Sequence, residues 1–439
     1  MIIAKAAPYA RANVRSRPSG WKKISPPSGH LSIMPKNEKQ ILEGSRAIAL
    51  TIKNIGPAVV SAYPITPQTH IVEDLAEFKA DGRSDFEYVR AESEFAAASI
   101  VLGASATGVR VYSATSSQGL LLMTEVVHNI AGLRLPVVMT CANRAISSPI
   151  NIWNDHSDVI TVRDAGWIQL FAANHQEAVN QHVLAYKLAE KLRLPVMINV
   201  DGFILTHSYE PVVIPGREKI RKYLPAYRPS AGSYLDPKNP VTLGAFFTPQ
   251  DYMETREQLH HDLVASLPMI KNEYQAWKKI FHPADDEASG PKTPGRMNID
   301  NGLISYYGPQ KPDTVVIALG SVIGTIRSAL RDNPRIGVLK IKVYRPFPAA
   351  EIATCLQNAK NVAIIEKAVS LGQAGPLYTD IAAGLTEVKT GSLSKYNKRL
   401  NLKNYIVGLG GRDVTEKMII EIAKDAPKKN HYLKFIGQI

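Results

Sequence analysis

The chain has 439 residues, of which 45% are hydrophobic and 21% are charged, a composition typical of a globular protein with two or three domains. Two cysteines, Cys141 and Cys355, exclude a disulfide framework, an all-cysteine iron–sulfur cluster and a four-cysteine zinc site within this chain. Of the formal net charge of +13, residues 1–36 contribute seven Lys or Arg and no acid. The rest has 45 basic and 39 acidic residues, a net of +6, which does not indicate nucleic-acid binding.

No run of 18 apolar residues occurs, so we expect no transmembrane helix and no membrane partner. The scarcity of cysteine fits a reducing compartment, and we expect a cytoplasmic location. Residues 1–36, rich in Ala, Arg, Ser and Pro, predict a disordered basic extension. A transit peptide, or an extension ahead of a true start at Met34, is the alternative.

From residue 38 to about 207, helical patterns alternate with short apolar runs rich in Val, Ile and aromatic residues. This alternation predicts right-handed βαβ units and a parallel sheet covered on both faces. The predicted helices are residues 38–53, 67–79, 92–107, 118–131 and 174–189. The predicted strands are residues 57–63, 86–91, 109–114, 136–142 and 195–200.

The alternation is lost after residue 208, where seven prolines occur between Pro211 and Pro249. Residues 251–281 predict one long helix, broken at Pro268. Because long irregular segments are uncommon inside compact proteins, we expect residues 211–310 to be a connector arm that packs on another surface.

Strand and helix patterns resume at residue 313 and predict a second, smaller α/β domain. Its predicted strands lie in DTVVIALG, IGVLKIKVYRPFP, NVAIIEK and NYIVGLG, and its helices near residues 322–332, 349–359, 375–385 and 414–425. The predicted fold class is therefore α/β, with two parallel-sheet domains, residues 37–210 and 311–439.

Open parallel sheets bind ligands outside the carboxyl ends of their strands, so the strand-to-helix corners are the candidate sites. In the first corner, AYPITPQTH at residues 62–70, Thr66 either caps the following helix or presents its hydroxyl to a ligand. In the second, RAESEFAAA, Glu94 either complements the helix dipole or is a partly buried carboxylate with a specific partner.

The third corner, TSSQG, has Ser116, Ser117 and Gly119 at a helix start, where they form either a cap or the polar wall of a pocket. In the fourth, Arg144 follows an apolar strand. It is either a solvated surface residue or a planar clamp for a carboxylate. His156 and Asp158 follow in the next loop, but no nucleophile or ligand spacing there supports a triad or a metal site.

Together these corners resemble the α subunit, or PorA-type region, of pyruvate:ferredoxin oxidoreductases. The matching motifs are YPITP, ESEFAA, TSSQGLLLM, the Asn143-Arg144 loop, NDHSDV, LPVMINVDGFILTH, YRPFP and GLGGRDVT. The resemblance covers residues 38–425, with the motifs in order, so their combination is highly specific. The resemblance implies a thiamine-diphosphate-binding domain of the pyrimidine type, followed by a transketolase C-terminal-like domain.

The resemblance also implies roles for single residues. Glu94 matches the glutamate that hydrogen-bonds the pyrimidine N1′, which favours the tautomer able to deprotonate the thiazolium C2. Pro64, Ile65 and Ser117 are expected to line the cofactor. Thr66 matches a residue that hydrogen-bonds the substrate, and Arg144 matches one that pairs with the substrate carboxylate.

The diphosphate and Mg²⁺ of such enzymes usually need a GDG motif, which this chain lacks. We therefore expect a β-type partner subunit to share the thiamine diphosphate and to carry the Mg²⁺ and a [4Fe–4S] cluster. Ferredoxin-like δ and γ subunits would then relay electrons to ferredoxin. Coenzyme A is the implied second substrate. The Gly408–Gly411 turn could approach this anion, although a tight strand–helix turn is the simpler interpretation.

The predicted function is oxidative decarboxylation of pyruvate to acetyl-CoA and CO₂ with reduction of ferredoxin, or the reverse, by a hetero-oligomer that contains this chain. One alternative is the same chemistry on oxalate, 2-oxoglutarate or a branched-chain 2-oxo acid. Others are a transketolase- or dehydrogenase-type thiamine subunit and a non-catalytic scaffold. The YPITP corner argues against a transketolase- or dehydrogenase-type subunit. The joint presence of Glu94, Thr66 and Arg144 argues against a non-catalytic scaffold.

Overall fold

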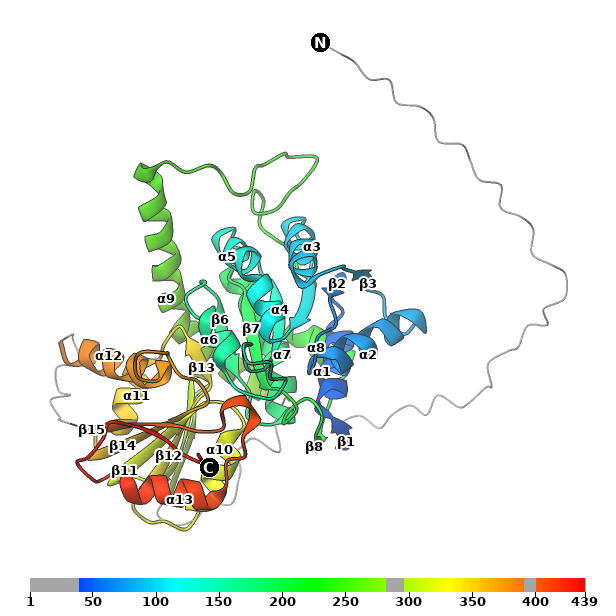
Figure 1. The fold of residues 1–439 in the computed structure, drawn as a ribbon. Coiled ribbons are helices and arrows are strands. Elements are labelled where there is room, and N and C mark those ends of the chain that lie inside the picture. The colour runs from blue at the N-terminus through cyan, green and yellow to red at the C-terminus, as the bar shows by residue number, and fades with distance from the viewer. Residues whose placement is uncertain (1–38, 282–295, 391–399, 439) are drawn as a thin grey trace, which may run out of the picture. The chain divides into compact units, whose positions relative to one another are not determined.

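The computed structural model describes residues 39–281, 296–390 and 400–438 of the chain. These residues form two seven-stranded sheets and one two-stranded sheet (Figure 1). The predicted basic extension, residues 1–36, lies outside the described residues. Within the described ranges, no helix is long and apolar enough to cross a membrane.

The first sheet has the strand order β13-β6-β7-β5-β4-β2-β3. Strands β2 to β7 run parallel to their neighbours, as predicted, while β13 pairs antiparallel with β6 at one edge. The sheet is therefore mostly parallel. Its strands are β2 (Val59–Ala62), β3 (Glu87–Arg90), β4 (Val111–Thr115), β5 (Val138–Asn143), β6 (Ile168–Phe171), β7 (Val196–Asp201) and β13 (Val343–Arg345).

Helices follow the strands of this sheet in the predicted alternation. Side-chain caps determine where two of them begin. Ser93 Oγ accepts a hydrogen bond from Ala96 N at the start of α3, and Asn174 Oδ1 accepts one from Glu177 N at the start of α7. The helices are α1 (Gly44–Ile55), α2 (Thr69–Ala80), α3 (Glu94–Ala106), α4 (Ser117–Leu122), α5 (Thr124–Gly132), α6 (Ser157–Thr161) and α7 (His175–Leu192).

The predicted helix over residues 38–53 begins too early. Its first residues form β1 (Gln40–Glu43), which pairs antiparallel with β8 (Tyr209–Val212), a partner far away in the sequence. The prediction that residues 118–131 form one helix is also wrong, because Met123 separates α4 from α5.

The helix after the YPITP corner begins at Thr69, with Gln68 in the N-cap position. The interpretation of Thr66 as a helix cap is therefore wrong. Strand β6 was not predicted, because its four residues stand alone in a stretch without alternation.

The connector contains α8 (Arg217–Tyr223) and α9 (Pro249–Phe281). The predicted break at Pro268 is wrong, since α9 runs through this residue without interruption. Its buried residues Ile270, Tyr274 and Trp277 lie on the side that packs against α7. This packing holds the helix together despite the missing proline N–H.

The second sheet has the order β16-β15-β14-β11-β12-β10-β9. Strand β10 runs antiparallel to both neighbours, and the parallel pairs are β12 with β11, β11 with β14, β14 with β15 and β15 with β16. Two strands, β9 and β10, arise from the stretch predicted as connector. The elements are β9 (Arg296–Asp300), β10 (Ile304–Pro309), β11 (Thr314–Ala318), α10 (Val322–Leu330), β12 (Ile336–Ile341), α11 (Ala349–Leu356), β14 (Asn361–Glu366), α12 (Pro376–Thr390), β15 (Asn401–Ile406), α13 (Glu416–Asp425) and β16 (Leu433–Phe435).

The run IGVLKIKVYRPFP, predicted as one strand, is divided between the two sheets at Lys342. The buried Lys342 ammonium lies 2.8 Å from an Asp300 carboxylate oxygen and 3.4 Å from one of Glu177 in α7. Burial alone would raise the pKa of Asp300, but Lys342 lowers it to about 2. The Asp300 carboxylate therefore contributes stability above about pH 4 that is lost as the pH falls toward 2.

We expect Lys342→Met to lower the apparent free energy of unfolding by about 3–5 kcal/mol, because it leaves the buried Asp300 carboxylate without its cation, whereas Glu177 keeps its ion pair with Lys340. Urea unfolding followed by circular dichroism measures this. The control is Lys360→Met, which removes an ammonium that is 72% exposed and pairs with Asp313. That change should lower the apparent free energy of unfolding by less than about 1 kcal/mol. Equal losses in the two variants would contradict the role given to Lys342.

Candidate active site

Four strand-to-helix corners follow β2, β3, β4 and β5. Because these strands are parallel neighbours, their corners lie along one edge of the first sheet. The structure thus brings Thr66, Glu94, Ser117 and Arg144, one from each corner, to the same edge.

Glu94 is the first residue of α3 and is 8% exposed. It lies against Gly119 in the first turn of α4. A Cβ atom on Gly119 would lie 2.8 Å from Glu94 Oε1 and 2.6 Å from Thr115 Oγ1. Both distances are too short for a side chain, so glycine is required where α4 crosses the carboxylate.

Polar atoms of the second and third corners lack a hydrogen-bond partner within the described part of the chain. Among the described residues, none donates a hydrogen bond to the Glu94 carboxylate, and Thr115 Oγ1 and Gln118 Nε2 are buried without a hydrogen bond. Burying an unpaired polar group costs roughly 1–3 kcal/mol. This wall therefore fits a ligand that has both donor and acceptor atoms, such as an aminopyrimidine ring.

Arg144 follows β5 and reaches the first corner. Its Nη1 donates a hydrogen bond to the Thr66 carbonyl oxygen at 2.9 Å, and its Nε donates one to the Asn151 carbonyl oxygen at 3.1 Å. Partial burial lowers the pKa of the guanidinium, which remains charged at neutral pH. Thr66 and Pro64 are exposed and Ile65 is half-buried, so this corner forms the open part of the site.

One fully buried carboxylate, Asp158, joins the third and fourth corners. Its Oδ2 accepts hydrogen bonds from the backbone N–H groups of Ser117 and Arg144, each at 3.0 Å, and its Oδ1 accepts one from Asn143 Nδ2 at 3.2 Å. Burial raises the pKa of the Asp158 carboxyl to about 6. Since the ionised carboxylate is the stronger acceptor, the positions of both corners depend on its charge.

Two further side chains brace this edge. The buried Ser117 hydroxyl lies 2.5 Å from the Ala145 carbonyl oxygen, so it is bonded within the chain and helps to build the wall. Gln68 ties the first corner to β4, because its Nε2 donates to the Ala114 carbonyl oxygen at 2.7 Å and its Oε1 accepts from Ile65 N at 3.3 Å.

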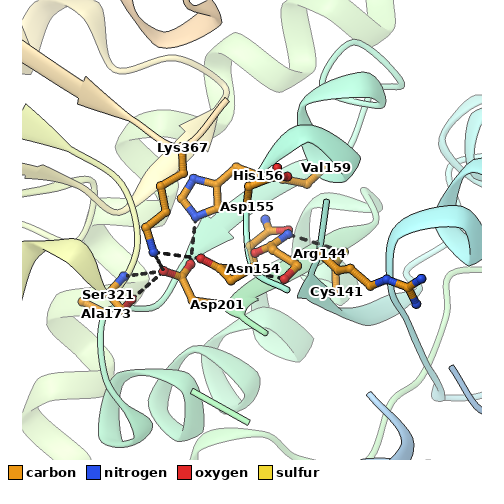
Figure 2. A network of polar contacts seen from close by, with 12 residues as sticks. Cys141, Arg144, Asn154, Asp155, His156, Val159, Ala173, Asp201, Ser321 and Lys367 are labelled. Atoms are coloured by element: carbon orange, nitrogen blue, oxygen red, sulfur yellow. Dashed lines mark hydrogen bonds and ion pairs between the residues drawn. The ribbon is translucent and has the colours of Figure 1, made fainter. Parts of the chain in front are cut away.

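A second buried network connects the two sheets (Figure 2). Asp201 ends β7 and accepts hydrogen bonds from Ser321 Oγ at 2.5 Å and Lys367 Nζ at 3.2 Å, and its Oδ1 lies 2.8 Å from His156 Nε2. Burial alone would raise the pKa of Asp201, but Lys367 and His156 hold it well below its ordinary value. These groups bond to one another, which makes the network structural. Figure 2 shows the Arg144 side chain extending away from it.

The turn at Gly408–Gly411 faces the loop that follows Arg144. Gly410 N donates to an Asp155 carboxylate oxygen at 3.2 Å, and Gly411 N donates to the Asn154 carbonyl oxygen at 2.7 Å. Its glycines at 408, 410 and 411 all have positive φ, as a tight turn requires. These N–H groups are thus occupied within the chain.

Sequence reasoning missed the roles of Asp158, Gln68, Thr115 and Gln118. Thr115 and Gln118 flank the two serines of the third corner, so a search for polar residues beside each corner could have found them. No local pattern reveals that Asp158 bonds to Ser117, because the hydrogen bond spans 41 residues.

Comparisons with known proteins agree with the motifs. The family model described as pyruvate flavodoxin/ferredoxin oxidoreductase, thiamine diP-bdg, matches residues 51–275, and that of pyruvate:ferredoxin oxidoreductase core domain II matches residues 312–419. The fold resembles a solved 2-oxoglutarate:ferredoxin oxidoreductase from Magnetococcus marinus with a TM-score of 0.63 and 20% sequence identity. That alignment covers 89% of this chain and 66% of the other, so this chain spans less than two thirds of it.

Curated relatives match over most of their length. The pyruvate synthase subunit PorA of Methanocaldococcus jannaschii is 42% identical, with 86% of this chain and 92% of the relative covered. The pyruvate synthase subunit PorA of Methanosarcina barkeri is 41% identical, and the alignment covers 88% of this chain and 92% of that relative. The ketoisovalerate oxidoreductase subunit VorA of Pyrococcus abyssi is 37% identical, and the alignment covers 89% of this chain and 94% of that relative. The chain therefore belongs to the pyruvate:ferredoxin oxidoreductase family, as an α subunit of the PorA type.

Proposed function

We propose that this chain provides the aminopyrimidine side of a thiamine diphosphate site and the residues that orient the carboxylate of a 2-oxo acid. The observation that carries the proposal is the buried Glu94 carboxylate, which has no hydrogen-bond donor among the described residues and lies directly beneath Gly119. A carboxylate on a largely buried residue without a donor among the described residues is a suitable binding point for a ligand group that donates a hydrogen bond.

When bound, thiamine diphosphate supplies the nucleophilic carbon and the electron sink for decarboxylation. Glu94 would hold a proton at the pyrimidine N1′. The unpaired Thr115 hydroxyl and Gln118 amide are available to polar atoms of the same ring. Pro64 and Ile65 would line the cofactor, and Ser117 would hold the wall in place.

Arg144 and Thr66 would orient the substrate. The Arg144 guanidinium is held in place by two backbone carbonyls, one of them that of Thr66, so the charged fork and the Thr66 side chain belong to one rigid unit. Because the carboxylate leaves as neutral CO₂, the charge of Arg144 serves positioning more than stabilisation of the transition state.

Pyruvate is the proposed substrate, supported by the PorA relatives at 41–42% identity. A branched-chain 2-oxo acid is the second candidate, because the VorA relative is 37% identical over a similar share of the chain. Acetyl-CoA and CO₂ would be the products of pyruvate oxidation, with ferredoxin as the electron acceptor.

The rest of the active site would come from partners. We propose a β-type subunit for the diphosphate, Mg²⁺ and a [4Fe–4S] cluster, and ferredoxin-like δ and γ subunits for electron relay. In this proposal, residues 37–210 are the pyrimidine-type domain, residues 211–310 the connector and residues 311–439 a transketolase C-terminal-like domain. A cytoplasmic location remains a prediction.

We expect Glu94→Gln to lower kcat of the assembled complex by at least ~100-fold, because the amide cannot hold the N1′ proton as a carboxylate does. Pyruvate- and coenzyme A-dependent reduction of a viologen dye measures this. Glu92→Gln, at an exposed position two residues earlier, is the control, and its kcat should be close to that of the wild type. Full activity in Glu94→Gln would refute the assignment.

Arg144→Lys should raise the KM for pyruvate by roughly 10–100-fold while changing kcat less. The ammonium keeps the charge but loses the planar fork and with it a charge-assisted hydrogen bond. Steady-state kinetics separates the two constants. Arg331→Lys, at a residue that is 71% exposed in its side chain, should leave both unchanged. An unchanged KM for pyruvate in Arg144→Lys would argue against contact between Arg144 and the substrate.

For the wild type, activity should fall as the pH drops through about 6, because protonation of Asp158 weakens its bonds to Ser117 and Arg144. Asp158→Asn should lower kcat/KM by roughly tenfold and remove that acid limb. A pH profile of kcat/KM tests both effects. Asp164→Asn, at an exposed carboxylate, should keep the wild-type profile. An acid limb that persists in Asp158→Asn would belong to another group.

A further inference from the structure

Three metal-ligating side chains from separate elements converge outside the site described above. Glu43 ends β1, His70 lies in the first turn of α2, and His207 lies between β7 and β8. One ligand atom from each lies within 4.8 Å of the other two. The Nδ1 atom of His70 is 2.6 Å from Glu43 Oε1, and the ring centroids of His70 and His207 are 4.5 Å apart.

The surroundings favour a cation. His207 is half-buried beside His70, and its Nδ1 lies 2.7 Å from Thr206 Oγ1, a bond of the kind that orients a metal-binding imidazole. Glu43 and His70 also line an open cavity of about 390 Å³, together with Glu73 one turn further along α2. Arg46 also lines this cavity and is already paired with acidic residues of α2.

The ion pair between Glu43 and His70 does not include the second imidazole, that of His207. The His70 and His207 rings lie at a tilt of 35° to each other, and only His70 bonds to the Glu43 carboxylate directly. Two histidines and one carboxylate are a recurrent ligand set for zinc, with a water molecule in the fourth position.

We propose that Glu43, His70 and His207 bind a divalent transition-metal ion, with zinc as the preferred ion. Tetrahedral zinc has ligand bonds of about 2.0–2.2 Å, which places ligand atoms about 3.3 Å apart. The three atoms are already within 4.8 Å, and the side chain of His70 is 47% exposed. Metal binding would replace the 2.6 Å hydrogen bond between His70 and Glu43 and adjust the three ligand atoms to this spacing through rotation of the exposed His70 side chain.

The ion would join three segments that the sequence keeps far apart. It would tie β1 and the segment before β8 to the first turn of α2, which begins three residues after Thr66. Its role is therefore to restrain the first corner without touching the substrate. This inference does not rest on the proposed activity, since the ligands lie outside the Glu94 wall.

The test uses the full-length chain, stripped with a chelator and titrated with Co²⁺ as a spectroscopic probe and with Zn²⁺ in competition. We expect one equivalent to bind. His70→Gln and His207→Gln should each weaken binding by at least about tenfold, since even loss of a group that only supports a ligand has that effect. No saturable one-to-one binding to the wild-type chain would overturn the proposal.

The matched control removes another histidine pair, His260 and His261, whose rings lie 5.8 Å apart on α9. The double variant His260→Gln/His261→Gln should bind as the wild type does. Loss of binding in this control, with retention in His70→Gln, would move the site to α9 and overturn the assignment. X-ray absorption of the zinc-loaded wild-type chain provides a test without substitutions. Two imidazole ligands with oxygen support the proposal, and a sulfur ligand from Cys141 or Cys355 refutes it.

Discussion

The carboxylate of Asp158 accepts the backbone N–H groups of Ser117 and Arg144, and the geometry of the candidate site follows from these two bonds. Fixing Ser117 places the first turn of α4, and therefore Gly119, over Glu94. Fixing Arg144 allows its guanidinium to reach the Thr66 carbonyl. One buried charge thus sets the spacing between the wall proposed for the cofactor and the residues proposed for the substrate. Its burial raises its own pKa, which is the electrostatic cost of this arrangement.

Residues of the second sheet's domain also support the edge of the first sheet at which the candidate site lies. Asp201 at the end of β7 is held by Lys367 and Ser321, both from the second sheet's domain, and by His156 from the loop that leads to Asp158. The same loop accepts the backbone N–H groups of the Gly408–Gly411 turn. Residues of the second sheet's domain therefore hold the loop that leads into α6 and Asp158, which explains how a domain without any of the proposed catalytic residues still contributes to the site.

Much of the architecture could be predicted from local patterns, because alternating helices and apolar runs produce a parallel sheet whose corners share an edge. Thr66, Glu94 and Arg144 were candidates from their places at those corners, and the resemblance implied their roles, which stay a prediction. The family itself was confirmed by the comparisons. Features that depend on distant partners could not be predicted. Strand β1 forms because it pairs with β8, which is distant in the sequence. The strand break at Lys342 depends on the ion pairs of this residue with Asp300 and Glu177. The role of Asp158 depends on hydrogen bonds from two distant backbone N–H groups.

The pairing of β13 with β6 limits how the chain can be divided. A fragment that ended before β9 would keep Thr66, Glu94 and Arg144 but would leave β6 as a bare edge, with a row of unpaired backbone groups along four residues that are now buried. Open apolar edges of this kind recruit other chains and promote aggregation. Any gene rearrangement that moves the two sheets onto separate polypeptides must therefore keep residues 343–345 with the first sheet.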